Sequence, residues 1–324
     1  MPESHERTPI RTPYLVLGLI ALAFVGGQKL LARFGGSTPA RCSEASVRAV
    51  RERLDTYRGD PRILRDAEVD LRRILDADRR CAPAYVEQAR WYSLSGYIQG
   101  DRYDQNFIAQ ASRAINRALA LDPSSFDAHI ERAYVSLHQQ EFAAARSACE
   151  RAAELQPDRP EVDLLLGIFA NHDGEEATAE FHANAILDKT TDHALRNSAY
   201  EILIDVYWHR RDFDQVIGVE EQALAMEDTA WRRHDLADAL IHAKQYDRAI
   251  SMARSALEKM DFPAGRRTLA HAYAEKARGR VAQGALRDAA GLYEEALRAD
   301  PTYAARTELN QVLERLEVAS QGAM

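Results

Sequence analysis

Small and aliphatic residues recur along most of the chain in pairs seven positions apart. Seven residues are two turns of an α-helix, so the members of each pair lie on one helical face. Small side chains on that face let a neighbouring helix approach closely. The pairs are Ala67/Ile74, Ala111/Ala118, Ala145/Ala152, Ala179/Ile186, Val216/Ala223, Ala249/Ala256 and Ala289/Ala296. Their first members are 33 to 44 residues apart, which predicts stacked helical hairpins.

A second set of packing residues begins 16 positions before Val216 in one repeat and 13 positions before Ala249 in the next. In one repeat these residues are Tyr200, Leu203, Ile204 and Tyr207, followed by Phe213; in the next they are Leu236, Ala237 and Leu240, followed by Tyr246. Leu166 and Gly167 form a Leu-Gly pair ahead of Ala179, and prolines end the predicted second helices at Pro123, Pro157 and Pro301. This pattern resembles the tetratricopeptide repeat (TPR), most clearly between residues 126 and 261.

The resemblance implies an all-α fold: a right-handed superhelical solenoid of about seven helix-turn-helix repeats, with essentially no strand. The array is expected over residues 43–319, with residues 303–319 as a capping helix and 320–324 as a tail. Extra residues around Gly96 and Tyr103 predict a lengthened first helix and loop, and residues 266–283 predict another long first helix. An irregular helical bundle is the alternative, but it does not explain the repeated spacing.

The N-terminal region contains an uncharged stretch from Thr12 to Gln28. At about 1.5 Å per residue this stretch is near the lower limit for crossing a bilayer. We expect a cytoplasmic tail (1–11), a transmembrane anchor (12–34) and a linker (35–42). A cleaved signal peptide and a buried helix are the alternatives. The flanking basic residues are balanced and do not decide the orientation.

Charge and motifs exclude several function classes. The net charge is -8 and basic residues are scattered among acidic ones, so nucleic acid is not an expected partner. The sequence contains no HExxH, GxSxG, GxxxxGK[ST], GxGxxG or CxxC motif. We therefore expect no enzymatic activity, no cofactor, no bound metal and no small-molecule substrate.

The TPR resemblance implies a concave groove lined by positions 2, 5, 9, 12 and 13 of each first helix. Aromatic and aliphatic side chains beside a few carboxylates would suit a protein or peptide ligand. The predicted groove residues are Ile130, Tyr134, Leu137, His138, Leu164, Ile168, His172, Asp205, Trp208, His209, Trp231, His234, Asp238, Ile241 and His242. Packing against the neighbouring repeat is the alternative role for each of them.

Four of these residues, His138, His172, His209 and His242, share position 13 of successive repeats. Such a column could bind a metal or change charge between pH 5 and 8. The simpler interpretation, which we favour, is that histidine suits the last turn of a helix, where it can donate to unpaired carbonyls.

The cysteines suggest one disulfide bond. Cys42 precedes the first helix of the first repeat and Cys81 follows its second helix. The two ends of an antiparallel hairpin lie together, so a Cys42–Cys81 bond is predicted, with two unrelated thiols as the alternative. Cys149 is expected to be a buried free thiol. Such a bond would place the array in an oxidising compartment.

These features predict a single-pass protein of a bacterial inner membrane, with its TPR domain in the periplasm. We expect a scaffold or assembly factor that binds the membrane through its N-terminal helix and a protein or peptide through its groove. An apoprotein-binding subunit of the cytochrome-maturation type and a structural subunit of an envelope complex are the alternatives. A structural subunit should carry a second apolar patch.

Overall fold

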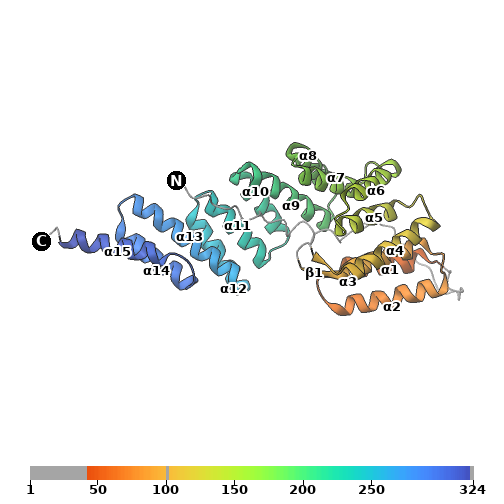
Figure 1. Cartoon of the computed structure of the whole chain (residues 1–324), viewed down its shortest axis with the longest axis horizontal. Coiled ribbons are helices and arrows are strands. Elements are labelled where there is room, and N and C mark those ends of the chain that lie inside the picture. Colours follow the sequence, from red (N-terminus) through yellow and green to blue (C-terminus); the bar gives the residue numbers. More distant parts are fainter. Residues whose placement is uncertain (1–41, 100–101, 322–324) are drawn as a thin grey trace. The chain divides into compact units, whose positions relative to one another are not determined.

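The computed structural model describes residues 42–99 and 102–321. Within these ranges fourteen helices follow one another as seven pairs, and a fifteenth helix ends the chain (Figure 1). The pairs are α1 (Glu44–Asp55) with α2 (Pro61–Ala77), α3 (Ala82–Gly96) with α4 (Gln105–Leu121), α5 (Phe126–His138) with α6 (Phe142–Leu155), α7 (Pro160–Asp173) with α8 (Glu176–Lys189), α9 (His193–Arg210) with α10 (Phe213–Met226), α11 (Ala230–His242) with α12 (Tyr246–Lys259), and α13 (Pro263–Ala282) with α14 (Leu286–Ala299). The last helix is α15 (Arg306–Gln321).

The chain forms two compact units, Met1–Ile202 and Leu203–Met324, with the boundary inside α9. Within the first unit α3 lies beside α4 and α5 beside α6, and within the second α11 lies beside α12 and α13 beside α14 (Figure 1). The number of repeats, the long α13 and the terminal helix agree with the sequence prediction.

Small residues between helices explain the close packing. Of the fourteen residues in the seven-residue pairs, thirteen have no exposed surface, and Ile74 alone is partly exposed. Six helices begin at an N-cap residue whose side-chain oxygen accepts a hydrogen bond from a backbone N–H of the first turn. These residues are Ser43, Asp60, Asp104, Ser125, Asp212 and Thr229.

The expectation of a strand-free array needs one correction. Between α3 and α4 the chain forms two short antiparallel strands, β1 (Tyr97–Gln99) and β2 (Arg102–Tyr103), with Tyr97 opposite Tyr103. Their rings meet edge to face, 5.7 Å apart. A Cβ atom on Gly96 would lie 2.6 Å from Cβ of Phe107, so glycine lets α4 begin close to the end of α3.

The predicted cytoplasmic tail (1–11) and anchor (12–34) lie outside the described residues, as does most of the linker. In the part of the chain that is described, no helix combines the length and the apolar character needed to cross a bilayer.

Candidate functional site

The first helices of successive pairs lie next to one another within each unit. In the first unit α1 contacts α3, α3 contacts α5 and α5 contacts α7; in the second α11 contacts α13. The side chains at the TPR groove positions of these helices form what we call the first-helix face. This face carries the candidate site.

The predicted groove residues differ widely in exposure. Five are buried: Ile130, Tyr134, Leu164, His234 and Ile241. Six are partly buried: Leu137, His138, Ile168, Asp205, Trp208 and Asp238. Four are exposed: His172, His209, Trp231 and His242. The buried residues pack inside the array, so the exposed and partly buried ones are the candidates for contact with a ligand.

The position-13 histidines all lie in the last turn of a first helix. Three of them pack against an aromatic ring that precedes or begins the second helix of the preceding pair. The ring centroids are 4.0 Å apart for Tyr103 and His138, 4.0 Å for Phe142 and His172, and 5.1 Å for Phe213 and His242. Neighbouring pairs are thus joined by a repeated ring contact, which the sequence analysis did not foresee.

Packing against neighbouring rings lowers the pKa of two of these histidines. Burial lowers the pKa of His138 to about 4, and the rings of Trp208 and Phe213, which partly desolvate the imidazole of His242, also lower its pKa. Both imidazole rings are therefore neutral at neutral pH. Within the described residues, no three His, Cys, Asp or Glu side chains are grouped so that they could hold a metal ion.

A chain of buried and partly buried ion pairs joins the first helices of the first unit. Arg51 of α1 donates from Nε to Glu87 of α3 at 2.6 Å and from Nη2 to Asp127 of α5 at 2.6 Å. Arg90 of α3 donates to Asp55 of α1 at 2.5 Å. Glu87 is 1% exposed and Arg90 is 4% exposed, so these charges have little access to water. One arginine therefore links three successive first helices.

Glu131 of α5 lies in the same charged region and is buried. Burial is the main cause that raises its pKa to about 7; Arg90 opposes the shift and Glu87 adds to it. The folded protein therefore holds this proton more tightly than the unfolded chain does.

Replacing Glu131 by Gln should make stability less dependent on pH. Because the folded-state pKa is raised, the stabilisation from Glu131 is complete below about pH 4.5 and is lost as the pH rises through about 7. Glu131→Gln should match the parent near pH 5 and be more stable at pH 8, by on the order of 3 kcal/mol. Urea unfolding between pH 5 and 8 measures this difference. The exposed Glu52→Gln is the control, and a difference that does not change with pH would contradict the assignment.

The second unit presents tryptophans on the same face. Trp231, at the start of α11, is 43% exposed, and its ring lies 4.5 Å from that of the buried Phe262. Trp208 is partly buried, with its ring 5.3 Å from Phe213 and 5.0 Å from His242. These indole rings are held by their neighbours and leave apolar surface open to solvent.

The disulfide pairing is present in the structure. The sulfur atoms of Cys42 and Cys81 are bonded, and the two Cα atoms are 5.3 Å apart, within the range of natural disulfides. Cys149 is a buried free cysteine, and burial raises the pKa of its thiol to about 12.

Comparisons with known proteins agree with the repeat architecture. A family model described as tetratricopeptide repeat matches residues 101–160, which include α4, α5 and α6. No curated protein sequence gives a significant match.

Solved structures show the same kind of fold at low identity. A structure of pilF from Pseudomonas aeruginosa is 19% identical, with a TM-score of 0.51, over 72% of this chain and 98% of that chain. Human IFIT1, solved as a dimer with m7Gppp-AAAA, is 15% identical, with a TM-score of 0.53, over 86% of this chain and 63% of that chain. The repeat matched over residues 101–160 and the fold of these neighbours support a tetratricopeptide repeat architecture.

Proposed function

We propose that this protein is a membrane-tethered scaffold or assembly factor that captures a protein or peptide on the first-helix face of its second unit. The observation that carries the proposal is the exposed indole of Trp231, which rests on Phe262. Binding hot spots are enriched in tryptophan that is held rigidly by its neighbours.

Trp208 adds a second anchor in the same unit. Its contacts with Phe213 and His242 fix the ring, so a ligand that covers it loses little side-chain entropy from the protein. The third tryptophan, Trp91, has a different role, because its indole N–H donates to the Leu64 carbonyl at 2.7 Å inside the first unit. Two of the three tryptophans are therefore candidates for ligand contact.

The second helices offer less support for a purely structural subunit. In the described part of the chain, their exposed large apolar side chains are Val69 of α2 and Phe181 of α8. These residues stand on different helix pairs and do not make a continuous apolar patch of the size expected for a buried subunit.

The proposed location is a bacterial inner membrane, with the array on the periplasmic side. The apolar run within residues 12–34 supports the tether, and the Cys42–Cys81 pair supports an oxidising compartment.

Truncating both tryptophans should weaken capture. Crosslinking and mass spectrometry in native membranes identify the partner, and its affinity is then compared between the parent and the Trp208→Ala/Trp231→Ala variant. We expect a loss of about 2 kcal/mol or more, roughly 30-fold in Kd, because anchor residues of this kind dominate binding.

Phe181→Ala is the matched control, since it removes an aromatic ring that is 68% exposed on a second helix. Circular dichroism of each variant reports whether the helices persist. Unchanged affinity in a folded double variant, or an equal loss in Phe181→Ala, would contradict the assignment of the binding face.

A further inference from the structure

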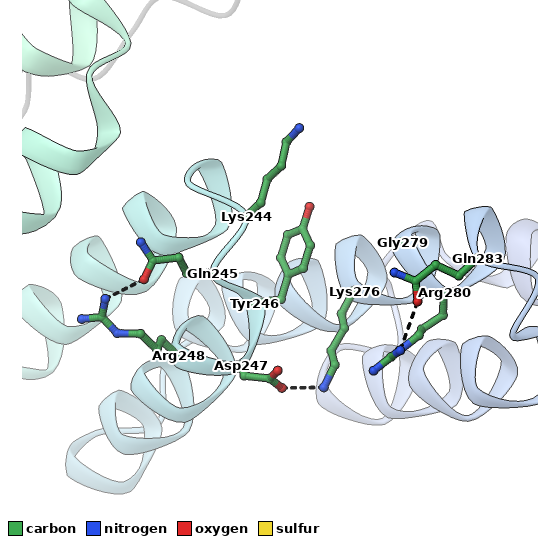
Figure 2. A pocket seen from close by; sticks show the side chains of 9 residues that line it. All are labelled: Lys244, Gln245, Tyr246, Asp247, Arg248, Lys276, Gly279, Arg280 and Gln283. Atoms are coloured by element: carbon green, nitrogen blue, oxygen red, sulfur yellow. Dashed lines mark hydrogen bonds and ion pairs between the residues drawn. The ribbon is translucent and has the colours of Figure 1, made fainter.

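A pocket of about 410 Å³ lies between the start of α12 and the C-terminal half of α13 (Figure 2). Its lining includes Lys244 from the turn before α12, Tyr246 from the first turn of α12, and Lys276, Gly279 and Arg280 from α13. Figure 2 shows Tyr246 and these α13 residues on opposite sides of the opening. All belong to the second unit.

At the pocket, the first residue of a second helix is aromatic but, among the residues described, has no ring partner on the following first helix. Phe142, Phe213 and Tyr246 are each the first residue of a second helix. Phe142 and Phe213 pack against a histidine of the following first helix. For Tyr246 the following first helix is α13, and in the described part of the chain no aromatic or imidazole ring packs on it. The Tyr246 ring is left as an open platform.

Gly279 keeps the opposite wall open. A Cβ atom added there would meet no heavy atom within 4 Å, so the space beside this glycine is empty rather than filled by a neighbour. A larger side chain at this position would occupy the pocket without displacing the backbone. Alanine would add only one methyl group and leave most of the pocket open.

The pocket is lined mainly by positively charged side chains, although the protein as a whole is acidic. Four cationic side chains, Lys244, Arg248, Lys276 and Arg280, line it with one carboxylate, Asp247, whereas the whole chain has a net charge of -8. Lys276 pairs with Asp247 at 2.5 Å, and Arg248 pairs with Glu221 at 2.5 Å. Among the described residues neither Lys244 nor Arg280 has a carboxylate partner; Arg280 donates only to the neutral Gln283 side chain, at 3.1 Å, so two positive charges are not neutralised.

We propose that this pocket binds a segment of a polypeptide that carries a ring side chain next to a carboxylate. The ring stacks on Tyr246 in the place that a histidine takes beside Phe142 and Phe213, and the carboxylate is attracted by the positive charges of Lys244 and Arg280. A pocket of this volume is large enough for such a pair of groups. A nucleic acid fits less well, because its successive phosphates would meet Glu221 and Asp247 beside the cations. This inference rests on the proposed function and names the chemistry of the partner.

The test is a selection from a random peptide library on the full-length protein in detergent, followed by Kd measurements on the enriched peptides. Enriched peptides should contain Phe, Tyr or Trp next to Asp or Glu. Gly279→Leu should raise the Kd of these peptides at least tenfold, because the leucine side chain fills the pocket. Lys244→Gln/Arg280→Gln should raise the Kd by a similar factor, because it removes the two cations that lack a carboxylate partner. Gly279→Ala and the exposed Arg267→Gln on the same helix are the matched controls and should bind like the parent.

Several outcomes would overturn the inference. These are enrichment of peptides that lack a carboxylate, undiminished binding by a folded Gly279→Leu variant, and displacement of the peptides by a single-stranded oligonucleotide. The Trp208→Ala/Trp231→Ala variant separates this inference from the proposed function. Loss of peptide binding in that variant but not in Gly279→Leu refutes the pocket and leaves the tryptophan face intact. The opposite pattern supports the pocket alone.

Discussion

Replacing Cys42 by Ser is expected to lower the free energy of unfolding by up to about 4 kcal/mol. The disulfide closes a loop with a sequence separation of 39 residues, and the entropy of closing such a loop in the unfolded chain is of this size. Cys42 is exposed, so the substitution removes the bond without leaving a cavity. Denaturant unfolding measures the loss, and hydrogen exchange should locate it in α1 and α2.

The same experiment reports the compartment. The parent protein treated with reductant should match Cys42→Ser, and alkylation of the unreduced, unfolded protein should label Cys149 alone. Labelling of all three cysteines in protein taken from native membranes would contradict both the bond and the oxidising location. Equal stability with and without reductant would show that the first helix pair does not depend on the bond.

Replacing Arg51 by Met should cost about 3–5 kcal/mol. The change removes both ion pairs that Arg51 makes and leaves Glu87, which is 1% exposed, with only the 3.9 Å contact to Arg90. Removing one partner of a buried pair is expensive because the other charge stays in a poorly solvated site. Denaturant unfolding of the variant measures the cost.

Arg48→Met is the matched control on the same helix. Its pair with Glu44 is exposed and should contribute only about 0.5 kcal/mol. Adding Glu87→Gln and Asp127→Asn to Arg51→Met should recover part of the loss, because the unpaired charges are then gone. Equal effects of Arg51→Met and Arg48→Met would contradict the importance of the buried network.

The sequence was a good guide wherever one residue type recurs at one position. Alanine at the helix contact, as at Ala145 and Ala249, and proline after the second helix, as at Pro157, are local signals that need no knowledge of distant partners. They predicted the helix pairs and the length of α13. The hairpin around Tyr97 was missed because two or three strand residues are too few for an alternating pattern.

The candidate site was harder to predict because its contacts join distant positions. Arg51, Glu87 and Asp127 are separated by 36 and 40 residues and look like ordinary solvated charges in sequence. The contact of Phe213 with His242 was equally hidden, although both residues had been singled out separately. A rule that pairs the first residue of each second helix with position 13 of the next repeat would have revealed it. Ile130 and Leu164 stand at groove positions where other repeats carry exposed residues. Their burial depends on the packing of neighbouring helices, which the sequence does not show.

The Cys42–Cys81 bond also determines how the molecule responds to tension. Any pull on the chain ahead of Cys42 enters the array at that residue, where the covalent path divides. One branch runs through α1 and α2, and the other crosses directly to Cys81 through the sulfur atoms. The short branch becomes taut first, so α1 and α2 carry none of the load. Tension therefore does not unfold the first helix pair, and the force acts on the noncovalent packing of the array only from α3 onward.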